Sequence, residues 1–136
     1  MKIVVIDGQG GKIGKMIVEN IKDLVEEHEL IAIGTNALAT AAMIKGGAEL
    51  AATGENPVVV NAIDADVIIG PIGIVMANAL LGEVTEKMAV AVTSSSAKKI
   101  LIPISKCHHV VVGVQEYPLS HYIELVKEEI EKELGN

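Results

Sequence analysis

Runs of branched apolar residues alternate along the chain with stretches whose apolar positions recur every third or fourth residue. The run at residues 2–7 (KIVVID) ends at a glycine and contains almost only apolar side chains, which is typical of a strand buried on both faces. From residue 12 to about residue 27 the apolar positions lie three and four apart, which predicts an amphipathic helix. The chain therefore opens with a strand followed by a helix.

The same alternation continues to the end of the chain. The patterns predict further strands at residues 30–34, 48–53, 66–70, 88–92, 100–104 and 109–114. They predict helices at residues 37–45, 56–63, 74–81 and 119–134, with Asn36 capping the first and Pro57 at the first position of the second. Strands that alternate with helices over short connections indicate a three-layer, Rossmann-like α/β fold with a mostly parallel sheet.

Length and composition refine this prediction. A chain of 136 residues, of which 50% are hydrophobic, is long enough for one core and too short for two, so residues 1–136 are expected to form a single domain. The mean hydropathy of +0.45 is high for a small domain. It indicates a sheet buried by helices, and also an apolar surface closed by self-association, so we expect a homo-oligomer.

Charge and cysteine content exclude several kinds of partner. The formal net charge of −7, without a basic patch, argues against nucleic acid, and aromatic side chains for base stacking are scarce. The single Cys107 excludes an internal disulfide and a multi-cysteine metal site, so a cytoplasmic location is expected. A strand at residue 3 leaves no room for a signal peptide, and the longest apolar run, residues 67–81, is too short to cross a membrane.

The glycine-rich segment after the first strand is the main candidate site. A P-loop is excluded because five residues instead of four separate Gly8 from Gly14, and Met16 replaces the hydroxyl residue. The strict G-x-G-x-x-G pattern fails because Ile13 stands where its third glycine belongs. The pattern that fits is G-x-x-G-x-x-G, formed by Gly8, Gly11 and Gly14 between a strand and a helix, which is the context for binding a phosphate at a helix N-terminus.

Two resemblances follow from these residues. The segment GQGGKIG resembles the opening of dihydrodipicolinate reductases and related NAD(P)-dependent reductases, over about the first 35 residues. It implies a pyrophosphate turn made of Gly8, Gln9, Gly11, Lys12, Ile13 and Gly14. Over nearly its whole length the chain resembles a short bacterial Rossmann-like family of unknown function, on the segments IDGQGG, GTN, GENPVVVN, IIGPIGIVMANALLGE and KKILIP.

The end of the second strand departs from a nicotinamide site. Such a site places an acidic residue there to bind the ribose hydroxyls, whereas this chain has Thr35 and Asn36. Both can hydrogen-bond a ribose or a 2′-phosphate, but no arginine is adjacent, so neither NAD nor NADP is favoured as a cofactor. The alternative is that Asn36 only caps the next helix.

Asp7 places a carboxylate at the mouth of a site meant for anions. At about 4 Å from a phosphate it would cost on the order of 4 kcal/mol. Three arrangements remove this conflict: a magnesium ion, a neighbouring Lys12 or Lys15, or rotation of the carboxylate onto backbone N–H groups of the turn. The third needs no ligand.

Two other segments carry candidate chemistry. Ser94 and Ser95 belong to a serine-rich segment after the strand predicted at residues 88–92, where hydroxyl groups would bind a second anion or simply form a turn. Cys107, His108 and His109 suggest a metal site or a reactive thiolate, but in an extended segment His108 faces away from the other two.

The leading hypothesis is therefore a protein that binds a nucleotide or phosphate ligand, with phosphates on the turn from Gly8 to Gly14 and the ribose near Thr35 and Asn36. The alternatives are a small NAD(P)-dependent oxidoreductase and a structural or interaction module whose nucleotide site has degenerated. No catalytic residue and no metal ligand can be assigned from the sequence, and whether the protein is an enzyme stays open.

Overall fold

The computed structural model describes residues 1–104 and 108–135 and has five strands in one sheet, all parallel. The strands are β1 (Lys2–Asp7), β2 (Glu29–Gly34), β3 (Leu50–Thr53), β4 (Val67–Pro71) and β5 (Lys98–Ile102). Their order across the sheet is β3-β2-β1-β4-β5. The predicted α/β fold with a parallel sheet is thus confirmed, and the strand order reverses at β1, where a Rossmann-type sheet has its ligand crevice.

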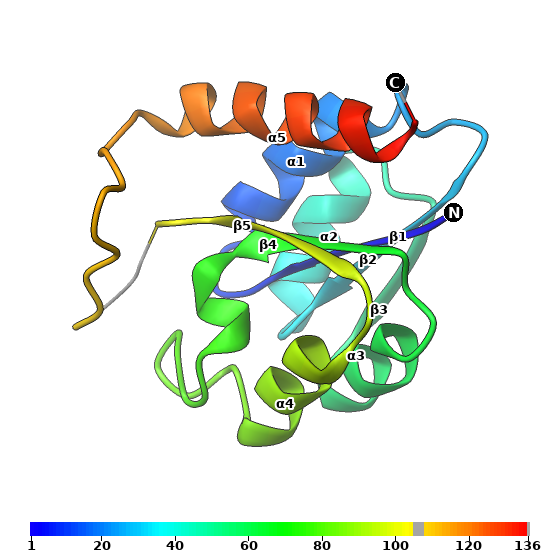
Figure 1. Ribbon diagram of the computed structural model, residues 1–136. Coiled ribbons are helices and arrows are strands. Elements are labelled where there is room, and N and C mark those ends of the chain that lie inside the picture. The colour runs from blue at the N-terminus through cyan, green and yellow to red at the C-terminus, as the bar shows by residue number, and fades with distance from the viewer. Residues whose placement is uncertain (105–107, 136) are drawn as a thin grey trace.

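Helices cover both faces of this sheet and make the three layers (Figure 1). The helices are α1 (Lys12–Ile21), α2 (Ala37–Lys45), α3 (Glu55–Ala62), α4 (Glu86–Ser94) and α5 (Leu119–Glu133), with a short 3₁₀ helix η1 (Ile72–Val75). Side chains of α1, α2 and α5 join one core cluster, and those of α3 and α4 join the other. The central strands β1 and β4 therefore bury both of their faces, which explains their continuous apolar runs, whereas the edge strand β3 is partly exposed.

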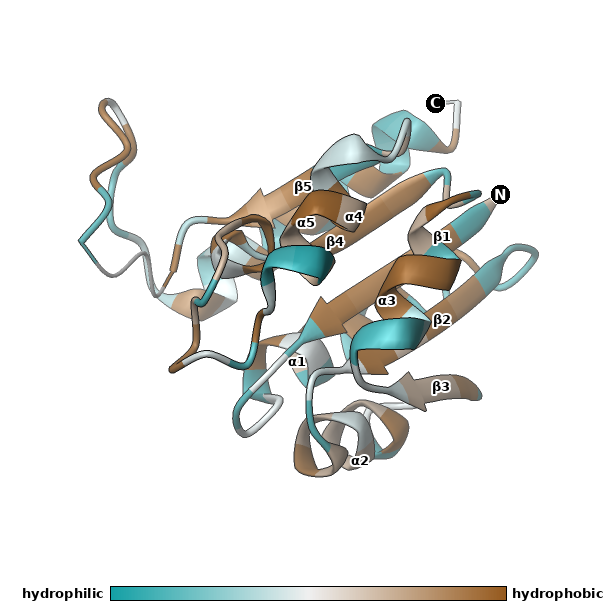
Figure 2. Ribbon diagram, turned by 90° about the horizontal axis from the view of Figure 1, so that it is seen from below, coloured by the Kyte–Doolittle hydropathy of each residue, from teal (hydrophilic) through white to brown (hydrophobic). Residues whose placement is uncertain are grey.

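The apolar side chains of the central strands follow this arrangement. Ile3 and Val5 point into the first cluster, while Val4 and Ile6 point into the second, and all four are almost fully buried. Hydropathy colouring shows the apolar residues concentrated along β1, β2 and β4 between the helices (Figure 2). Burial on this scale is the main contribution to the stability of the fold.

Three predicted elements are wrong. The segment at residues 88–92 is part of α4 and no strand, because Thr85 caps a helix by accepting a hydrogen bond from the Met88 N–H at 3.1 Å. The helix predicted at residues 74–81 is replaced by η1 and a loop at residues 76–84, in which Asn78, Leu80 and Leu81 have positive φ. A short apolar run does not by itself distinguish a buried strand from a helix.

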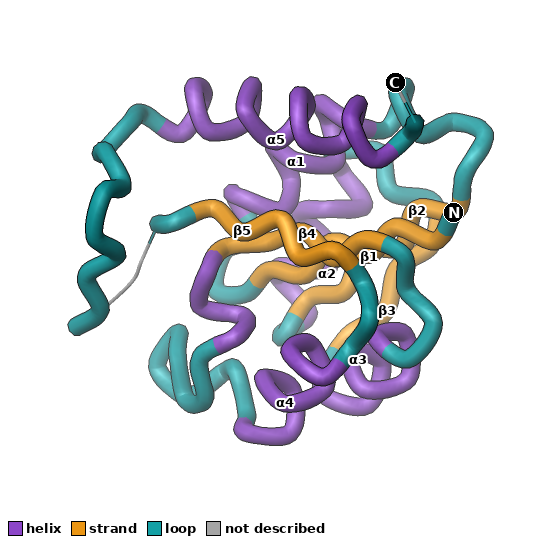
Figure 3. The backbone as a smooth tube through the Cα atoms, in the orientation of Figure 1, coloured by secondary structure: helices purple, strands orange, loops and turns teal. Residues whose placement is uncertain are grey.

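The third wrong prediction is the strand at residues 109–114, which is an extended loop with a turn at Val112 and Gly113. The Val114 N–H donates to the Val111 carbonyl at 3.2 Å, and Gly113 has a φ of 86°. The loop stands apart from the sheet (Figure 3), and Val110 and Val112 are 86% and 94% exposed.

Two predicted helix starts or ends also differ from the structure. Helix α1 ends at Ile21, after which turns continue to residue 27. Helix α3 begins at Glu55, so Pro57 is its third residue instead of its first. Pro is tolerated there because the first N–H groups of a helix have no intrahelical partner.

Candidate functional site

The glycine turn joins the carboxyl end of β1 to α1 at the centre of the sheet. The Gly11 N–H donates to the Gly8 carbonyl at 2.9 Å, and Gly11 has a φ of 74°, a conformation that other residues adopt only at a cost. A Cβ on Gly11 would also lie 2.7 Å from the Cα of Ala39, so α2 packs directly on this residue. Internal packing alone therefore requires a glycine at position 11.

The Asp7 side chain stabilises this turn through hydrogen bonds from the turn's backbone. Its side chain is only 4% exposed, and its Oδ1 accepts from the Gly8 N–H at 2.8 Å while its Oδ2 accepts from the Gly14 N–H at 2.6 Å. Of the three arrangements predicted for Asp7, the structure shows the rotation onto backbone N–H groups. Burial raises the pKa of Asp7, an effect that the hydrogen bonds from Gly14 and Gly8 oppose.

A second carboxylate, that of Glu83, also accepts a hydrogen bond from the backbone of the turn. Oε1 of Glu83 accepts three hydrogen bonds: from the Gln9 N–H at 2.8 Å, from the Thr35 hydroxyl at 2.6 Å and from the Asn36 amide at 2.8 Å. Burial alone would raise the pKa of Glu83, but the Thr35 hydroxyl, the Gln9 N–H and the Asn36 amide together lower it. Glu83 is therefore ionised near neutral pH.

Thr35 and Asn36 lie where the sequence placed them, at the end of β2 beside the turn. Asn36 both caps α2, accepting from the Ala39 N–H at 2.9 Å, and donates to the Gln9 carbonyl at 2.9 Å. The predicted cap is thus confirmed, and the amide nitrogen of Asn36 faces the turn, where it donates to the Gln9 carbonyl and to Glu83. The Thr35 N–H donates to the Asp7 carbonyl at 2.9 Å and ties the end of β2 to β1.

The loop at residues 76–84 delivers Glu83 to this position. The Asn78 N–H donates to the Val84 carbonyl at 2.7 Å and the Val84 N–H to the Ala79 carbonyl at 3.1 Å, so the loop closes on itself. Leu80 is 7% exposed and packs over Gly8, where an added Cβ would lie 2.7 Å from the Leu80 Cδ1. Left-handed backbone at a leucine is strained, and such strain is concentrated at functional sites.

A cavity of about 110 Å³ lies between this loop and the turn. Its lining is Asp7, Gly8, Gln9, Gly10, Gly11, Lys12, Ile13, Pro71 and Leu80. Among the residues that the structure describes, the N–H groups of Gly10 and Lys12 have no hydrogen-bond partner, and both residues are exposed. The open donors of the turn are therefore at its outer rim, because Asp7 and Glu83 use the inner ones.

The structure brings most of the predicted site residues together and separates two of them. The turn residues Gly8, Gln9, Gly11, Lys12 and Ile13 surround one cavity, with Gly14 bound to Asp7 and with Thr35 and Asn36 beside Gln9. The predicted position of Ser94 and Ser95, at the carboxyl end of a strand, is wrong. They precede β5 instead of following a strand, so they lie at the amino ends of the parallel strands, at the opposite edge of the sheet.

Glu83 is the site residue that sequence reasoning missed. It follows an apolar segment whose pattern resembles a helix, and no local motif marks it. It joins Thr35, which lies 48 positions earlier in the chain, only because residues 76–84 fold back over β1. The one available signal was the missing acidic residue at the end of β2.

Metal binding has no support in the part of the chain that the structure describes. No group of three or more histidine, cysteine, aspartate or glutamate side chains there could hold a metal ion. Cys107 lies outside the described residues, whereas His108 and His109 belong to the exposed loop that follows it. Within residues 1–104 and 108–135, no helix has the length and apolar character needed to cross a membrane.

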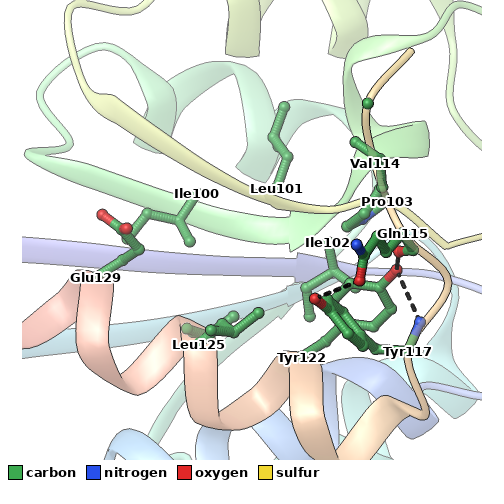
Figure 4. Close-up of a pocket in the computed structure, with 12 residues that line it drawn as sticks. Ile100, Leu101, Ile102, Pro103, Val114, Gln115, Tyr117, Tyr122, Leu125 and Glu129 are labelled. Atoms are coloured by element: carbon green, nitrogen blue, oxygen red, sulfur yellow. Dashed lines mark hydrogen bonds between the residues drawn. The ribbon is translucent and has the colours of Figure 1, made fainter. Parts of the chain in front are cut away.

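A second cavity, of about 420 Å³, lies between β5, α5 and the loop at residues 113–117 (Figure 4). Its walls are mainly apolar and include Ile100, Ile102, Leu125 and Tyr122. The hydroxyl of Tyr122 donates to the Gln115 carbonyl at 2.6 Å and so fixes the end of the loop. Among the described residues that line it, Glu129 is the only charged one, and none of the residues of the glycine turn belongs to its lining.

Comparison with known proteins gives a family and no function. A family model described as a domain of unknown function (DUF3842) matches residues 2–135. Searches of curated proteins and of solved structures found no match. What the site does must therefore be argued from its geometry.

Proposed function

The chain belongs to the DUF3842 family of unknown function, and on that premise we propose that it binds a nucleotide or another phosphate ligand, with a phosphate on the turn from Gly8 to Gly14. The observation that carries the proposal is the position of the turn: it follows the central strand, at the reversal of strand order, and the N–H groups of Gly10 and Lys12 at its rim are open. Parallel α/β sheets bind ligands in this crevice.

Charge at the rim supports an anion. Lys12 is the first residue of α1 and is exposed, so a cationic residue adjoins the open N–H groups of the helix N-terminus. Asp7 does not oppose a phosphate by facing it, because both carboxylate oxygens accept from the backbone of the turn. The ribose of a nucleotide would extend from the rim toward Thr35 and Asn36.

The size of the cavity restricts how the ligand lies. About 110 Å³ is well below the roughly 300 Å³ at which small-molecule pockets begin. Only a phosphate group therefore fits under Leu80, and the rest of a nucleotide would lie outside the cavity along the end of β2. A small NAD(P)-dependent oxidoreductase stays an alternative, with NAD or NADP as its cofactor, but no residue near the turn suggests a reaction.

A specific observation favours the other alternative, a structural or interaction module whose site has degenerated. Asp7 and Glu83 accept from the N–H groups of Gly8, Gln9 and Gly14, so the chain itself satisfies donors that a ligand would use. The two hypotheses differ in one measurable respect, which is whether any phosphate ligand stabilises the folded protein.

Thermal unfolding with NAD(H), NADP(H), ATP, GTP and flavins, each with and without magnesium, tests the proposal. A ligand at 100 times its dissociation constant adds about 2.7 kcal/mol to the free energy of unfolding. A shift with any of them supports the proposal. The absence of a shift with all of them, and with pyrophosphate, favours the degenerate module.

Gly10→Asp localises the binding. Nothing lies within 4 Å of a Cβ added at Gly10, so the fold should tolerate the change, while the new carboxylate repels a phosphate at the rim. Gly11→Asp is a poor test because α2 packs against that residue. Ser96→Asp is the matched control, since it adds the same charge at an exposed position at the opposite edge of the sheet. Equal loss of binding in both variants would contradict a phosphate site at the turn.

A further inference from the structure

The carboxylate of Glu83 uses only one of its two oxygens within the protein. Oε1 accepts from Gln9, Thr35 and Asn36, whereas Oε2 accepts no hydrogen bond from the described residues. The three donors converge on one oxygen from the turn, the end of β2 and the cap of α2. Such an arrangement fixes the carboxylate and leaves Oε2 as an oriented acceptor.

The position of this acceptor matches the sugar of a ligand whose phosphate lies at the rim of the turn. Oε1 is bound to the Gln9 N–H, and the open Gly10 N–H is the next one along the backbone. A group attached to a phosphate at Gly10 therefore passes Glu83 on its way to Thr35. Dinucleotide-binding sheets place an acidic residue at this point, the end of the second strand, to bind ribose hydroxyls.

Building on the proposed function, we propose that Glu83 is the specificity-determining residue of the site: its Oε2 accepts hydrogen bonds from the 2′- and 3′-hydroxyl groups of a bound ribonucleotide. Thr35 and Asn36 are positioning residues, because they hold Oε1 and do not themselves contact the sugar. The ligand class is a ribonucleotide with a free 2′,3′-diol.

Because Glu83 is charged, the proposal and its alternative predict opposite changes in ribonucleotide affinity when Glu83 is removed. An ionised carboxylate near a phosphate weakens binding, so Glu83 favours a ligand only through hydroxyl groups that donate to it. If Glu83 instead served only to block the turn, its removal would strengthen the binding of every phosphate ligand. A 2′-phosphate would face Oε2 directly, so the proposal also expects NADP to bind more weakly than NAD.

The experiment compares wild type and Glu83→Ala by isothermal titration with ADP, GDP and their 2′-deoxy forms. In wild type the ribonucleotide should bind about 10-fold more tightly than its deoxy form, the usual effect of one hydrogen bond to a charged acceptor. In Glu83→Ala the ratio should fall to near one. Removing the 2′-hydroxyl from the ligand and the carboxylate from the protein, singly and together, measures the coupling energy between these two groups.

Each remaining outcome decides something different. A ratio near one in wild type, or an unchanged ratio in the variant, overturns the role of Glu83, as does tighter binding of both forms by Glu83→Ala. Binding of pyrophosphate without binding of any diphosphate nucleotide leaves the proposed phosphate site standing and overturns the ribose role. Failure of all probes, pyrophosphate included, overturns the proposed function itself.

Two variants guard against an effect on folding. Glu86→Gln removes a nearby exposed charge that makes no hydrogen bond in the described part of the chain, and should keep the wild-type ratio. Glu83→Gln keeps a carbonyl acceptor for Gln9 and Thr35 while removing the charge, so its loop should stay in place. It should lower the ratio and narrow the difference between NAD and NADP, whereas retention of both wild-type values would overturn the proposal.

Discussion

The Asp7 carboxylate accepts a hydrogen bond from the Gly14 N–H at 2.6 Å, so the last residue of β1 is joined to the first turn of α1. Its other oxygen accepts from the Gly8 N–H, and the side chain is buried. The carboxylate thus satisfies two of the backbone N–H groups around the start of α1 that no helical carbonyl can reach.

Asp7→Asn should destabilise the protein by about 1–3 kcal/mol at pH 7, because its amide nitrogen would face one of the two buried N–H groups. Urea unfolding measures the difference. Asp64→Asn is the control, since Asp64 forms an exposed ion pair with Lys2 and its loss should change stability little. A loss for Asp7→Asn no larger than that of the control would show that the brace contributes little.

The two carboxylates of the site should titrate in opposite directions from their ordinary values. The pKa of Asp7 is raised above 3.8 by burial, so its ionisation costs stability as the pH rises from 3.8 through the raised value. The pKa of Glu83 is lowered below 4.5 by its three donors, against the opposing effect of burial. The stabilisation from ionised Glu83 is therefore present above pH 4.5 and lost as the pH falls through its folded pKa.

Carboxyl carbon NMR measures both titrations directly. Asp7 should titrate above the ordinary value for an aspartate and Glu83 below the ordinary value for a glutamate. The stability advantage of wild type over Glu83→Gln should shrink in acid. Titration of Glu83 above the ordinary value for a glutamate would contradict the stabilising effect of its three hydrogen-bond donors.

Leu81→Gly should stabilise the folded protein by about 0.5–1 kcal/mol, because Leu81 has a φ of 57° and a glycine adopts this conformation without strain. Leu81 is 98% exposed, so the change removes no packing. Leu81→Ala is the control and should give no such gain, since alanine keeps the unfavourable conformation. Thermal or urea unfolding distinguishes the two, and equal stabilities would show that the loop is not strained at this residue.

Tyr122→Phe should cost about 1 kcal/mol and should speed hydrogen exchange at the Tyr117 amide. The Tyr122 hydroxyl donates to the Gln115 carbonyl at 2.6 Å and accepts from the Tyr117 N–H at 3.3 Å, so it ties the loop to α5. Tyr117→Phe removes an exposed hydroxyl that, among the described residues, donates to the Gln115 side chain alone, and it should cost less. If both variants lose equally, the buried hydroxyl has no special role in holding the loop.

The sequence predicted the central strands because a continuous apolar run between turn residues is typical of a strand buried on both faces. β1 and β2 each follow a continuous apolar run between turn residues, and the glycine turn is marked by its spacing. The prediction failed for two apolar runs that do not form strands. The MAVAV run at residues 88–92 packs as a helix, and the valines at residues 110–112 lie in an exposed loop.

The candidate site was predictable only where it is local in sequence. Gly8 to Gly14 form one turn, and Thr35 with Asn36 ends the neighbouring strand, so strand pairing alone brings them together. Glu83 reaches them through a loop in which Leu80 and Leu81 have positive φ, a backbone conformation that leucine disfavours, so the sequence does not predict this loop. The misplacement of Ser94 followed from one error, because interpreting α4 as a strand moves its end to the wrong edge of the sheet.

The hydrogen bond between Glu83 and Thr35 makes the site depend on both halves of the chain. The turn, Asp7 and the end of β2 belong to the first half, whereas Glu83 belongs to the second half, in the loop that follows β4, the strand paired with β1. Without this loop, the glycine turn would lack the carboxylate that joins Gln9, Thr35 and Asn36. Under the proposed function, ligand selectivity would therefore depend on contacts between the two halves of the sheet and not on the turn alone.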